Sequence, residues 1–171
     1  MLEAVLFDLD GVLVDTESIS SKASEKVLGR HGIFLTDEEK RHVFGRRTID
    51  NYRDHIQARG LDLDAGQLVG EKNDLFKKLI EGNLEPLPGV LRLLDILEAS
   101  NVKTAVVSSS PLERVEATLM EADLFWRFPL IISGDCCDKG KPDPEPFLLA
   151  ARRLEVQPPG CLVFEDAQAG L

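Results

Sequence analysis

Asp8 and Asp10 are the first side chains along the chain whose types and spacing could do chemistry. They directly follow the apolar run Ala4–Phe7 and lie two residues apart, so both leave the same side of an extended backbone. Carboxylates this close repel each other unless a cation lies between them, and carboxylate and carbonyl oxygens are ligands that Mg²⁺ accepts. Either Asp could instead simply end a strand and cap a turn, which is a common role of this residue type.

Other polar side chains follow three later apolar runs. Alone, each has a simpler explanation, because serines often cap helices and a lysine in a polar loop is usually solvated. If the runs are parallel strands, their carboxyl ends meet in one crevice, where hydroxyls, a cation and carboxylates together can bind phosphate. These further candidates are Ser108, Ser109, Ser110, Lys141, Glu165 and Asp166.

The elements that must position these residues follow from the hydrophobic pattern. Four short runs rich in strand-forming residues alternate with segments of helical period, which predicts an α/β fold with a doubly wound, Rossmann-like parallel sheet. One helix start is expected at Ser110, with Pro111 in the first helical position and Glu113 three residues after the cap. The predicted strands cover residues 4–7, 102–107, 129–132 and 161–164.

The segment from residue 17 to 83 lacks a strand pattern and contains three consecutive helical patterns. Thr36 and Glu39 form a capping box that opens one of these helices, and Asp64 is expected to open another. We therefore expect an all-helical cap domain inserted into the core. The predicted division is a core of residues 1–16 and 84–171 and a cap of residues 17–83.

Composition and charge exclude several classes of protein. The net charge of −10 disfavours nucleic acid, which is bound through Lys and Arg. The three cysteines show no disulfide or zinc spacing, and no run of apolar residues is long enough to cross a membrane. A cytoplasmic protein with no nucleic-acid or membrane partner is expected. We also expect a monomer, and we assign the apolar pair Phe125 and Trp126 to the core rather than to an interface.

Four segments match, in order, the four motifs of the haloacid dehalogenase superfamily of phosphotransferases. The chain resembles this superfamily over nearly its whole length, and the helical insertion resembles the mobile cap of its beta-phosphoglucomutase-like branch. An Asp at position 10 disfavours dehalogenation, because the dehalogenases of the superfamily lack this second acid. The matching segments are residues 7–12, 107–109, 141–144 and 164–166.

The resemblance also implies roles for these residues. Asp8 would be the nucleophile that is transiently phosphorylated, and Asp10 would act first as general acid and then as general base. Mg²⁺ would be held by the Asp8 carboxylate, the Asp10 backbone carbonyl and Asp166, with Glu165 acting through a metal-bound water. The groups implied to bind the phosphoryl oxygens are Ser108, Ser109 and Lys141.

Three cap residues are candidates for substrate contact. Lys72 lies on an otherwise apolar helical stripe, where it could either snorkel to the rim or reach the substrate. The resemblance to the mutase branch favours the substrate. Arg46 and Arg47 lie between two expected cap helices and could either read a second anionic group or remain solvated.

The leading expectation is a magnesium-dependent phosphatase that acts on a small phosphorylated metabolite such as a sugar phosphate. A phosphomutase is the alternative, but Ser20 replaces the hinge His of the mutase, and Pro111 and Leu112 replace its Lys-Asn pair. The chain ends at Leu171, where the helix after the fourth motif should begin, so we expect the C-terminal part of the core to be missing. A catalytically incomplete magnesium-binding domain is therefore a third possibility.

Overall fold

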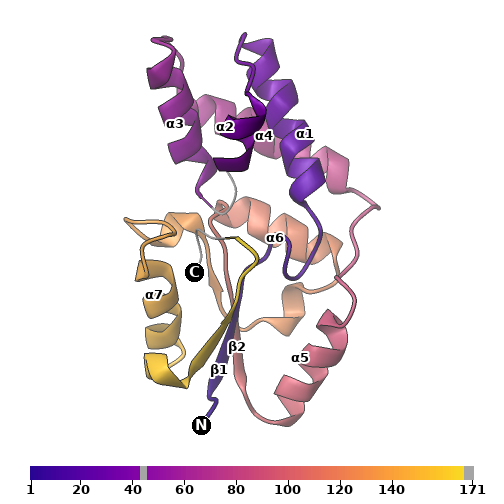
Figure 1. Ribbon diagram of the computed structural model, residues 1–171. Coiled ribbons are helices and arrows are strands. Elements are labelled where there is room, and N and C mark those ends of the chain that lie inside the picture. The colour runs from indigo at the N-terminus through magenta and orange to yellow at the C-terminus, as the bar shows by residue number, and fades with distance from the viewer. Residues whose placement is uncertain (43–45, 168–171) are drawn as a thin grey trace.

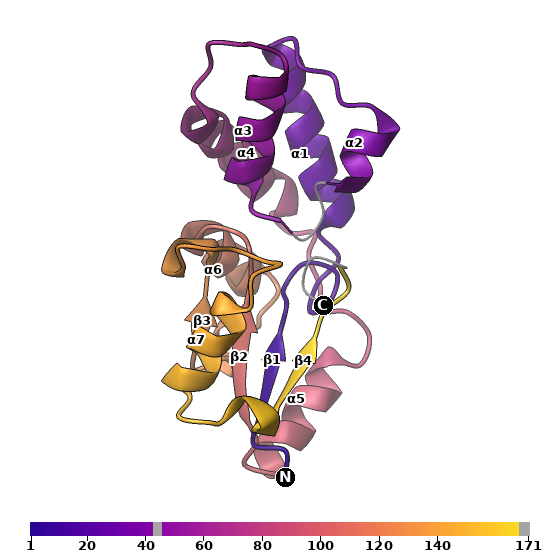
Figure 2. The same cartoon turned by 60° about the vertical axis from the view of Figure 1, so that its left-hand side comes forward.

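Four parallel strands form a single sheet in the order β3-β2-β1-β4 (Figures 1 and 2). The computed structural model describes residues 1–42 and 46–167. All four predicted strands are present, although β3 begins two residues later than expected. The strands are β1 (Ala4–Phe7), β2 (Lys103–Val107), β3 (Ile131–Ile132) and β4 (Cys161–Phe164).

Helices cover both faces of the sheet, which confirms the doubly wound α/β fold. Alternate residues of β1 point to opposite faces: Val5 and Phe7 pack under α5 and α6, whereas Ala4 and Leu6 pack under α7. This burial on both sides explains why the strands are continuous apolar runs. The covering helices are α5 (Val90–Ala99), α6 (Leu112–Glu121) and α7 (Glu145–Arg153), with single 3₁₀ turns η1 (Phe125–Arg127), η2 (Gly134–Cys136) and η3 (Pro158–Gly160).

A separate group of helices lies above the carboxyl ends of the strands (Figure 1). It has its own apolar core, which includes Leu28, Tyr52 and Leu68. The predicted capping box is present, because Thr36 N donates to Glu39 Oε2 at 2.8 Å and Glu39 N donates to Thr36 Oγ1 at 3.2 Å. The helices are α1 (Glu17–Arg30), α2 (Asp37–His42), α3 (Thr48–Ala58) and α4 (Ala65–Ile80).

These four helices are one more than the three helical patterns predicted. The apolar stripe of α1 is thin, since its buried residues are only Ala23, Val27 and Leu28, and this weakens its sequence signal. The predicted cap at Asp64 is confirmed, because its Oδ1 accepts from Gly66 N at 2.6 Å and opens α4. No helix in the described part of the chain is long and apolar enough to cross a membrane.

The two connections between the sheet and α1–α4 run side by side. Leu87 N donates to Leu13 O at 2.9 Å, and Val14 and Pro86 form an antiparallel bridge. The chain thus leaves the core and returns to it at neighbouring points. A division into a core of residues 1–16 and 84–171 and a cap of residues 17–83 remains our proposal, and residues 168–171 lie outside the described residues.

Two local predictions were wrong. Ser110 does not cap α6: the helix begins at Leu112, whose N–H donates to Asp135 Oδ2 at 2.7 Å, so a carboxylate from the η2 turn takes the capping role. Trp126 is not in the core, because it is 90% exposed, while its neighbour Phe125 packs partly against the core. Proximity in sequence therefore did not give these two aromatic rings the same environment.

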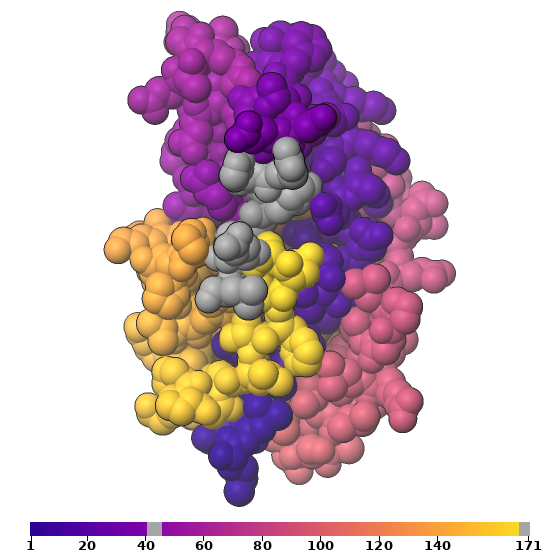
Figure 3. All heavy atoms as spheres, in the orientation of Figure 1, coloured from indigo at the N-terminus to yellow at the C-terminus, as the bar shows by residue number. Residues whose placement is uncertain are grey.

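The edge strand β4 carries exposed apolar residues. Leu162, Val163 and Phe164 are each more than a third exposed, unlike the residues of β1. In Figure 3, the yellow segment that includes β4 lies at the surface between α7 in orange and α5 in pink. This edge is the least covered part of the sheet.

Candidate active site

Asp8 and Asp10 leave the end of β1 on a tight turn formed by Gly11. The φ angle of Gly11 is +80°, which an L side chain rarely adopts. A Cβ atom here would also lie 1.9 Å from Oδ2 of Asp166, so only glycine lets this carboxylate approach the turn. The backbone at Gly11 thus brings together two motifs that are separated by most of the chain.

Lys141 joins Asp8 to the fourth motif. Its Nζ donates to Asp8 Oδ1 at 2.6 Å and to Glu165 Oε2 at 2.5 Å, and its side chain is only 1% exposed. Burial raises the pKa of Asp8 to about 7, against the attraction of Lys141, while Glu165 and Asp10 add repulsion. The two carboxylates raise the pKa of Lys141 despite its burial, so it remains a cation. A buried ammonium therefore lies behind Asp8.

Three carboxylates gather beside this ammonium. Oxygen atoms of Asp8, Glu165 and Asp166 all lie within 4.8 Å of one another. An all-oxygen set of this kind fits Mg²⁺. A divalent cation would also favour the ionised form of Asp8, whose pKa burial raises. The described residues thus fit the Mg²⁺ ion expected from the sequence.

The three serines after β2 have different surroundings. Ser108 is buried, and its Oγ accepts from Ser110 N at 3.1 Å. Ser109 lines the cavity beside Asp8 and Asp10. Ser110 Oγ donates to Asp10 Oδ2 at 3.4 Å, which accounts for its position better than a capping role would. Of the two predicted phosphate-binding serines, Ser109 is thus the one that borders the open space.

Asp10 is held by residues from three parts of the chain. Its Oδ1 accepts hydrogen bonds from Arg114 Nη2, at 3.1 Å, and from the hydroxyl of Thr16. Burial alone would raise the pKa of Asp10, but Arg114 and Thr16, with Lys72 and Ser110, outweigh it and lower the pKa. Asp10 is thus a carboxylate directed at the space between the sheet and the helices.

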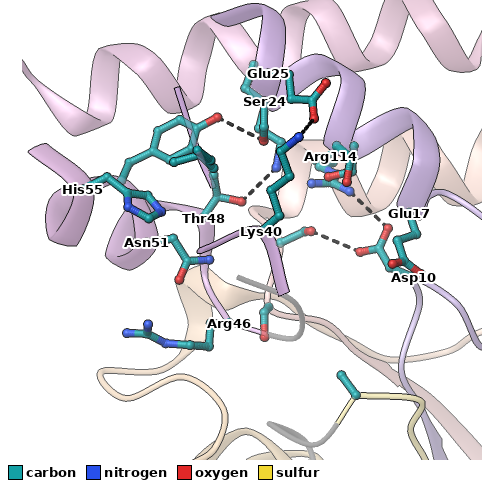
Figure 4. A pocket seen from close by; sticks show the side chains of 18 of the residues that line it. Asp10, Glu17, Ser24, Glu25, Lys40, Arg46, Thr48, Asn51, His55 and Arg114 are labelled. Carbon is teal, nitrogen blue, oxygen red and sulfur yellow. Dashed lines mark hydrogen bonds and ion pairs between the residues drawn. The ribbon is translucent and has the colours of Figure 1, made fainter. Parts of the chain in front are cut away.

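A cavity of about 280 Å³ lies between the carboxyl ends of the strands and helices α1, α3 and α4 (Figure 4). Its floor includes Asp8, Asp10, Ser109 and Asp166, so the predicted chemistry faces this partly open space. Its upper wall comes from the helices, and most of the side chains there are of polar types, although carbon atoms make up much of the lining. The residues there include Ser20, Ser24, Lys40, Arg46, Thr48, Asn51, Tyr52, His55 and Lys72.

Lys72 reaches this cavity rather than the solvent rim. It is 4% exposed, and its Nζ donates to Thr48 Oγ1 at 3.1 Å. Burial, with the nearby Arg114, lowers the pKa of Lys72 well below its usual range, and Asp10 opposes this only in part. An anionic or strongly polar group in the cavity would therefore stabilise its charged form.

The two cap arginines have different positions. Arg46 lines the cavity, and its Nη2 donates to Asp54 Oδ2 at 3.2 Å. Arg47 is not among the described residues that line it. Its guanidinium instead donates to Asp50 Oδ2 and to the backbone carbonyl of Cys137, which belongs to the core. From the sequence, both arginines were candidates for the same contact with substrate, but in the structure only the Arg46 side chain is among those that line the cavity.

Arg114 is the main site residue that the sequence analysis missed. It is 3% exposed, lines the cavity, and places its guanidinium 4.1 Å from the centre of the Phe76 ring of α4. Its position, one turn after the serines, was a usable signal, because helix α6 starts at the same sheet edge. His55 was also missed, and its Nε2 is buried without a hydrogen-bond partner among the described residues.

Comparisons with known proteins agree with this geometry. A phosphorylated carbohydrates phosphatase from Thermotoga maritima is 32% identical over 174 residues, covering 99% of this chain and 79% of the relative. The fructose-1-phosphate phosphatase YqaB of Escherichia coli is 32% identical over 169 residues, covering 98% of this chain and 88% of the relative. The crystal structure of a beta-phosphoglucomutase from Clostridium difficile superposes with a TM-score of 0.88 at 30% identity, covering 99% of this chain and 78% of that one.

The sequence model of one family spans almost all of the chain, matching residues 5–171. This range includes the four motif segments and the helical insertion. The match and the relatives at more than 30% identity lead to the same assignment. The chain belongs to the haloacid dehalogenase-like hydrolase family.

Proposed function

We propose that this protein is a magnesium-dependent phosphatase that hydrolyses a small phosphorylated metabolite, such as a sugar phosphate, through an aspartyl-phosphate intermediate. The family and the curated phosphatases among its relatives indicate a phosphoric monoester hydrolase. The observation that supports a metal-dependent reaction through an aspartyl-phosphate is the position of Asp8. It lies at the floor of a partly open cavity, between the ammonium of Lys141 and an acidic cluster suited to a metal.

In the first step a carboxylate oxygen of Asp8 attacks phosphorus as the P–O bond to the leaving alcohol breaks. The carboxyl proton of Asp10 passes to the departing oxygen, so that an alcohol and not an alkoxide leaves. Asp10 must be protonated for this transfer, yet Arg114 and Thr16 favour its charged form. Entry of a substrate that displaces these contacts would allow Asp10 to take up the proton.

In the second step a water molecule attacks phosphorus and the P–O bond to Asp8 breaks. Asp10, now ionised, accepts the proton of this water, and inorganic phosphate and the Asp8 carboxylate are released. Splitting one displacement into two suits phosphate monoesters, whose uncatalysed hydrolysis is among the slowest reactions known. The enclosing helices exclude bulk water from the intermediate until the alcohol has left.

Asp8 and Asp166, with the Asp10 backbone carbonyl and Glu165, would hold the Mg²⁺ ion. When bound, the metal supplies positive charge between the carboxylates and the phosphoryl oxygens. Lys141 neutralises part of the same charge from the buried side and keeps Asp8 and Glu165 together. Ser109 borders the cavity, which supports it as a donor to a phosphoryl oxygen.

The cavity wall supports a compact polar substrate. Hydroxyl, amide, imidazole and ammonium groups face a volume of about 280 Å³, which is too small for a polymer and suits one monosaccharide-sized group. The relatives named for phosphorylated carbohydrates and for fructose 1-phosphate support the same class for this chain. Lys72 is our candidate for contact with the leaving group, because it is the ammonium buried in this wall.

Release of inorganic phosphate from p-nitrophenyl phosphate and from a panel of sugar phosphates, with and without Mg²⁺, tests the proposal. We expect turnover that requires the metal and prefers one sugar phosphate over the aryl ester. Asp8→Asn should abolish it, because an amide is not a nucleophile here. The matched control is Asp15→Asn, a neighbouring acid that does not line the cavity among the described residues. If folded wild-type protein shows no turnover on any of these esters, the proposed function is wrong.

A further inference from the structure

Arg47 connects helix α3 of the cap to a loop of the core. Its Nε donates to Asp50 Oδ2 at 2.7 Å within the cap, and its Nη1 donates to the backbone carbonyl of Cys137 at 3.3 Å. The aliphatic part of the side chain lies over Gly140, where a Cβ atom would be 3.0 Å from both Cγ and Cδ of Arg47. One cap side chain thus rests on the core segment 137–140.

This core segment leads directly to the buried lysine of the site. Lys141 follows Gly140, and its ammonium holds Asp8 and Glu165. On its other side the segment is fixed to the start of α7, because Asp138 N and Lys139 N both donate to the carboxylate of Glu145 at 3.1 Å. The segment is therefore anchored within the core, and Arg47 adds an anchor from the cap.

Any motion that lifts α3 away from the sheet must break the bond to Cys137 and uncover Gly140. A hydrogen bond from a charged donor to a carbonyl is strong enough to bias such an equilibrium. A single bond of 3.3 Å is also weak enough to break in every catalytic cycle. Asp50 fixes the guanidinium in the orientation that reaches the core, so the contact is prepared before closure.

We propose that Arg47 is a positioning residue that latches the closed cap onto the 137–140 segment, and does not contact the substrate. This inference rests on the proposed function, because closure affects the rate only if the reaction takes place between cap and core. The latch stabilises the closed form and steadies the backbone next to Lys141. Arg46, which does line the cavity, has no such contact with the core among the described hydrogen bonds.

Arg47→Ala is the first test, with Arg53→Ala as the matched control. Arg53 pairs with the same Asp50, at 3.7 Å, but its side chain is 67% exposed and it lies on the cap alone. We expect Arg47→Ala to lower kcat/KM for a sugar phosphate about tenfold, the effect of losing one hydrogen bond from a charged donor. Arg53→Ala should stay within about twofold of wild type, as expected for an exposed ion pair. Arg47→Lys should recover part of the loss, because an ammonium keeps the charge but lacks the planar guanidinium that bonds Asp50 and Cys137 at the same time.

Gly140→Ala tests the contact from the core side. Gly140 does not have a positive φ, so alanine fits its backbone, and the three atoms nearest to the new methyl group all belong to the Arg47 side chain. We expect this variant to lower kcat/KM severalfold in the wild-type background and to have little further effect in the Arg47→Ala background. A substrate-binding arginine would instead give additive losses. Equal losses from Gly140→Ala in both backgrounds would overturn the latch.

Hydrogen exchange without substrate separates failure of the latch from failure of the proposed function. Arg47→Ala should speed exchange of the amides at residues 138–143 severalfold, whether or not any phosphate ester is hydrolysed, and Arg53→Ala should not. Unchanged exchange with normal phosphatase turnover rejects the latch alone. Faster exchange in a protein that hydrolyses no ester rejects the proposed function and retains the mechanical contact.

Discussion

Gly11→Ala tests whether the turn after β1 is built to admit Asp166. Alanine at φ +80° would carry the usual cost of the left-handed region, about 1–2 kcal/mol. In a chain of 171 residues this lowers Tm by roughly 2–8 °C. In addition, the new methyl group would lie 1.9 Å from Asp166 Oδ2 and must displace that carboxylate. We therefore expect both lower stability and weaker metal binding.

Gly60→Ala supplies the matched control, because Gly60 has φ +60° but no atom within 4 Å of the position of its Cβ. Both variants should lose the stability that the left-handed backbone costs, as measured by thermal unfolding followed by circular dichroism, and Gly11→Ala should lose at least as much as Gly60→Ala. Only Gly11→Ala should raise the Mg²⁺ concentration needed for half-maximal phosphate release, by about 10–100-fold, as is typical when a metal site loses its support. If the two variants need the same Mg²⁺ concentration, Asp166 does not serve the metal as we argue.

Three other predictions follow from burial and charge. The pKa of Asp8 is raised from 3.8 to about 7, so its contribution to stability is fully present below pH 3.8 and is lost as the pH rises through 7. Metal-free Asp8→Asn should therefore be more stable than wild type at pH 7 by a few kcal/mol, with no such gain near pH 4. Urea unfolding at the two pH values measures this difference. A wild type that equals Asp8→Asn at both pH values would contradict this. Lys72→Met should raise Tm by a few degrees in the absence of substrate, because it removes a buried ammonium bonded to the neutral hydroxyl of Thr48. The same variant should lower kcat/KM at least tenfold. A lower Tm would show that the charge of Lys72 is better compensated than we infer. Leu162→Lys should increase the soluble fraction after heating, measured by light scattering, because a charge on an edge strand opposes pairing with a strand of another molecule. Leu148→Lys on α7 is the control, and an equal gain in both variants would exclude an edge effect.

The sheet and the core motifs could be predicted from sequence because one local rule covers them. A strand buried on both faces must be a continuous apolar run, and polar residues directly after it must lie at the sheet edge. Asp8 and Asp166 meet the cavity for this reason. Predicting the cluster of Asp8, Glu165 and Asp166 needed the further assumption that the strands are parallel, which the alternation with helices supplied.

Contacts between the cap and the core could not be predicted, because they depend on how two layers pack. Arg114 and Phe76 lie 38 positions apart, and no local pattern brings their guanidinium and ring together. Arg46 and Arg47 are adjacent in sequence but diverge at the start of α3, where one side chain enters the cavity and the other reaches Cys137. Ser110 shows a similar limit, since an acid 25 residues away, Asp135, replaced it as the cap.

The paired connections at Leu13 and Leu87 also have a consequence for how such proteins can be rebuilt. Because the chain leaves and returns at hydrogen-bonded neighbours, the core fixes the two ends of this segment next to each other, although Phe76 and Ile80 of α4 also pack in the cluster that contains β1. A segment that replaced it would have to join the same two points to keep the register of β1 and β2, and would have to supply the packing of Phe76 and Ile80. The fold thus provides, at Leu13 and Leu87, neighbouring points at which the helices above the floor of carboxylates could be exchanged.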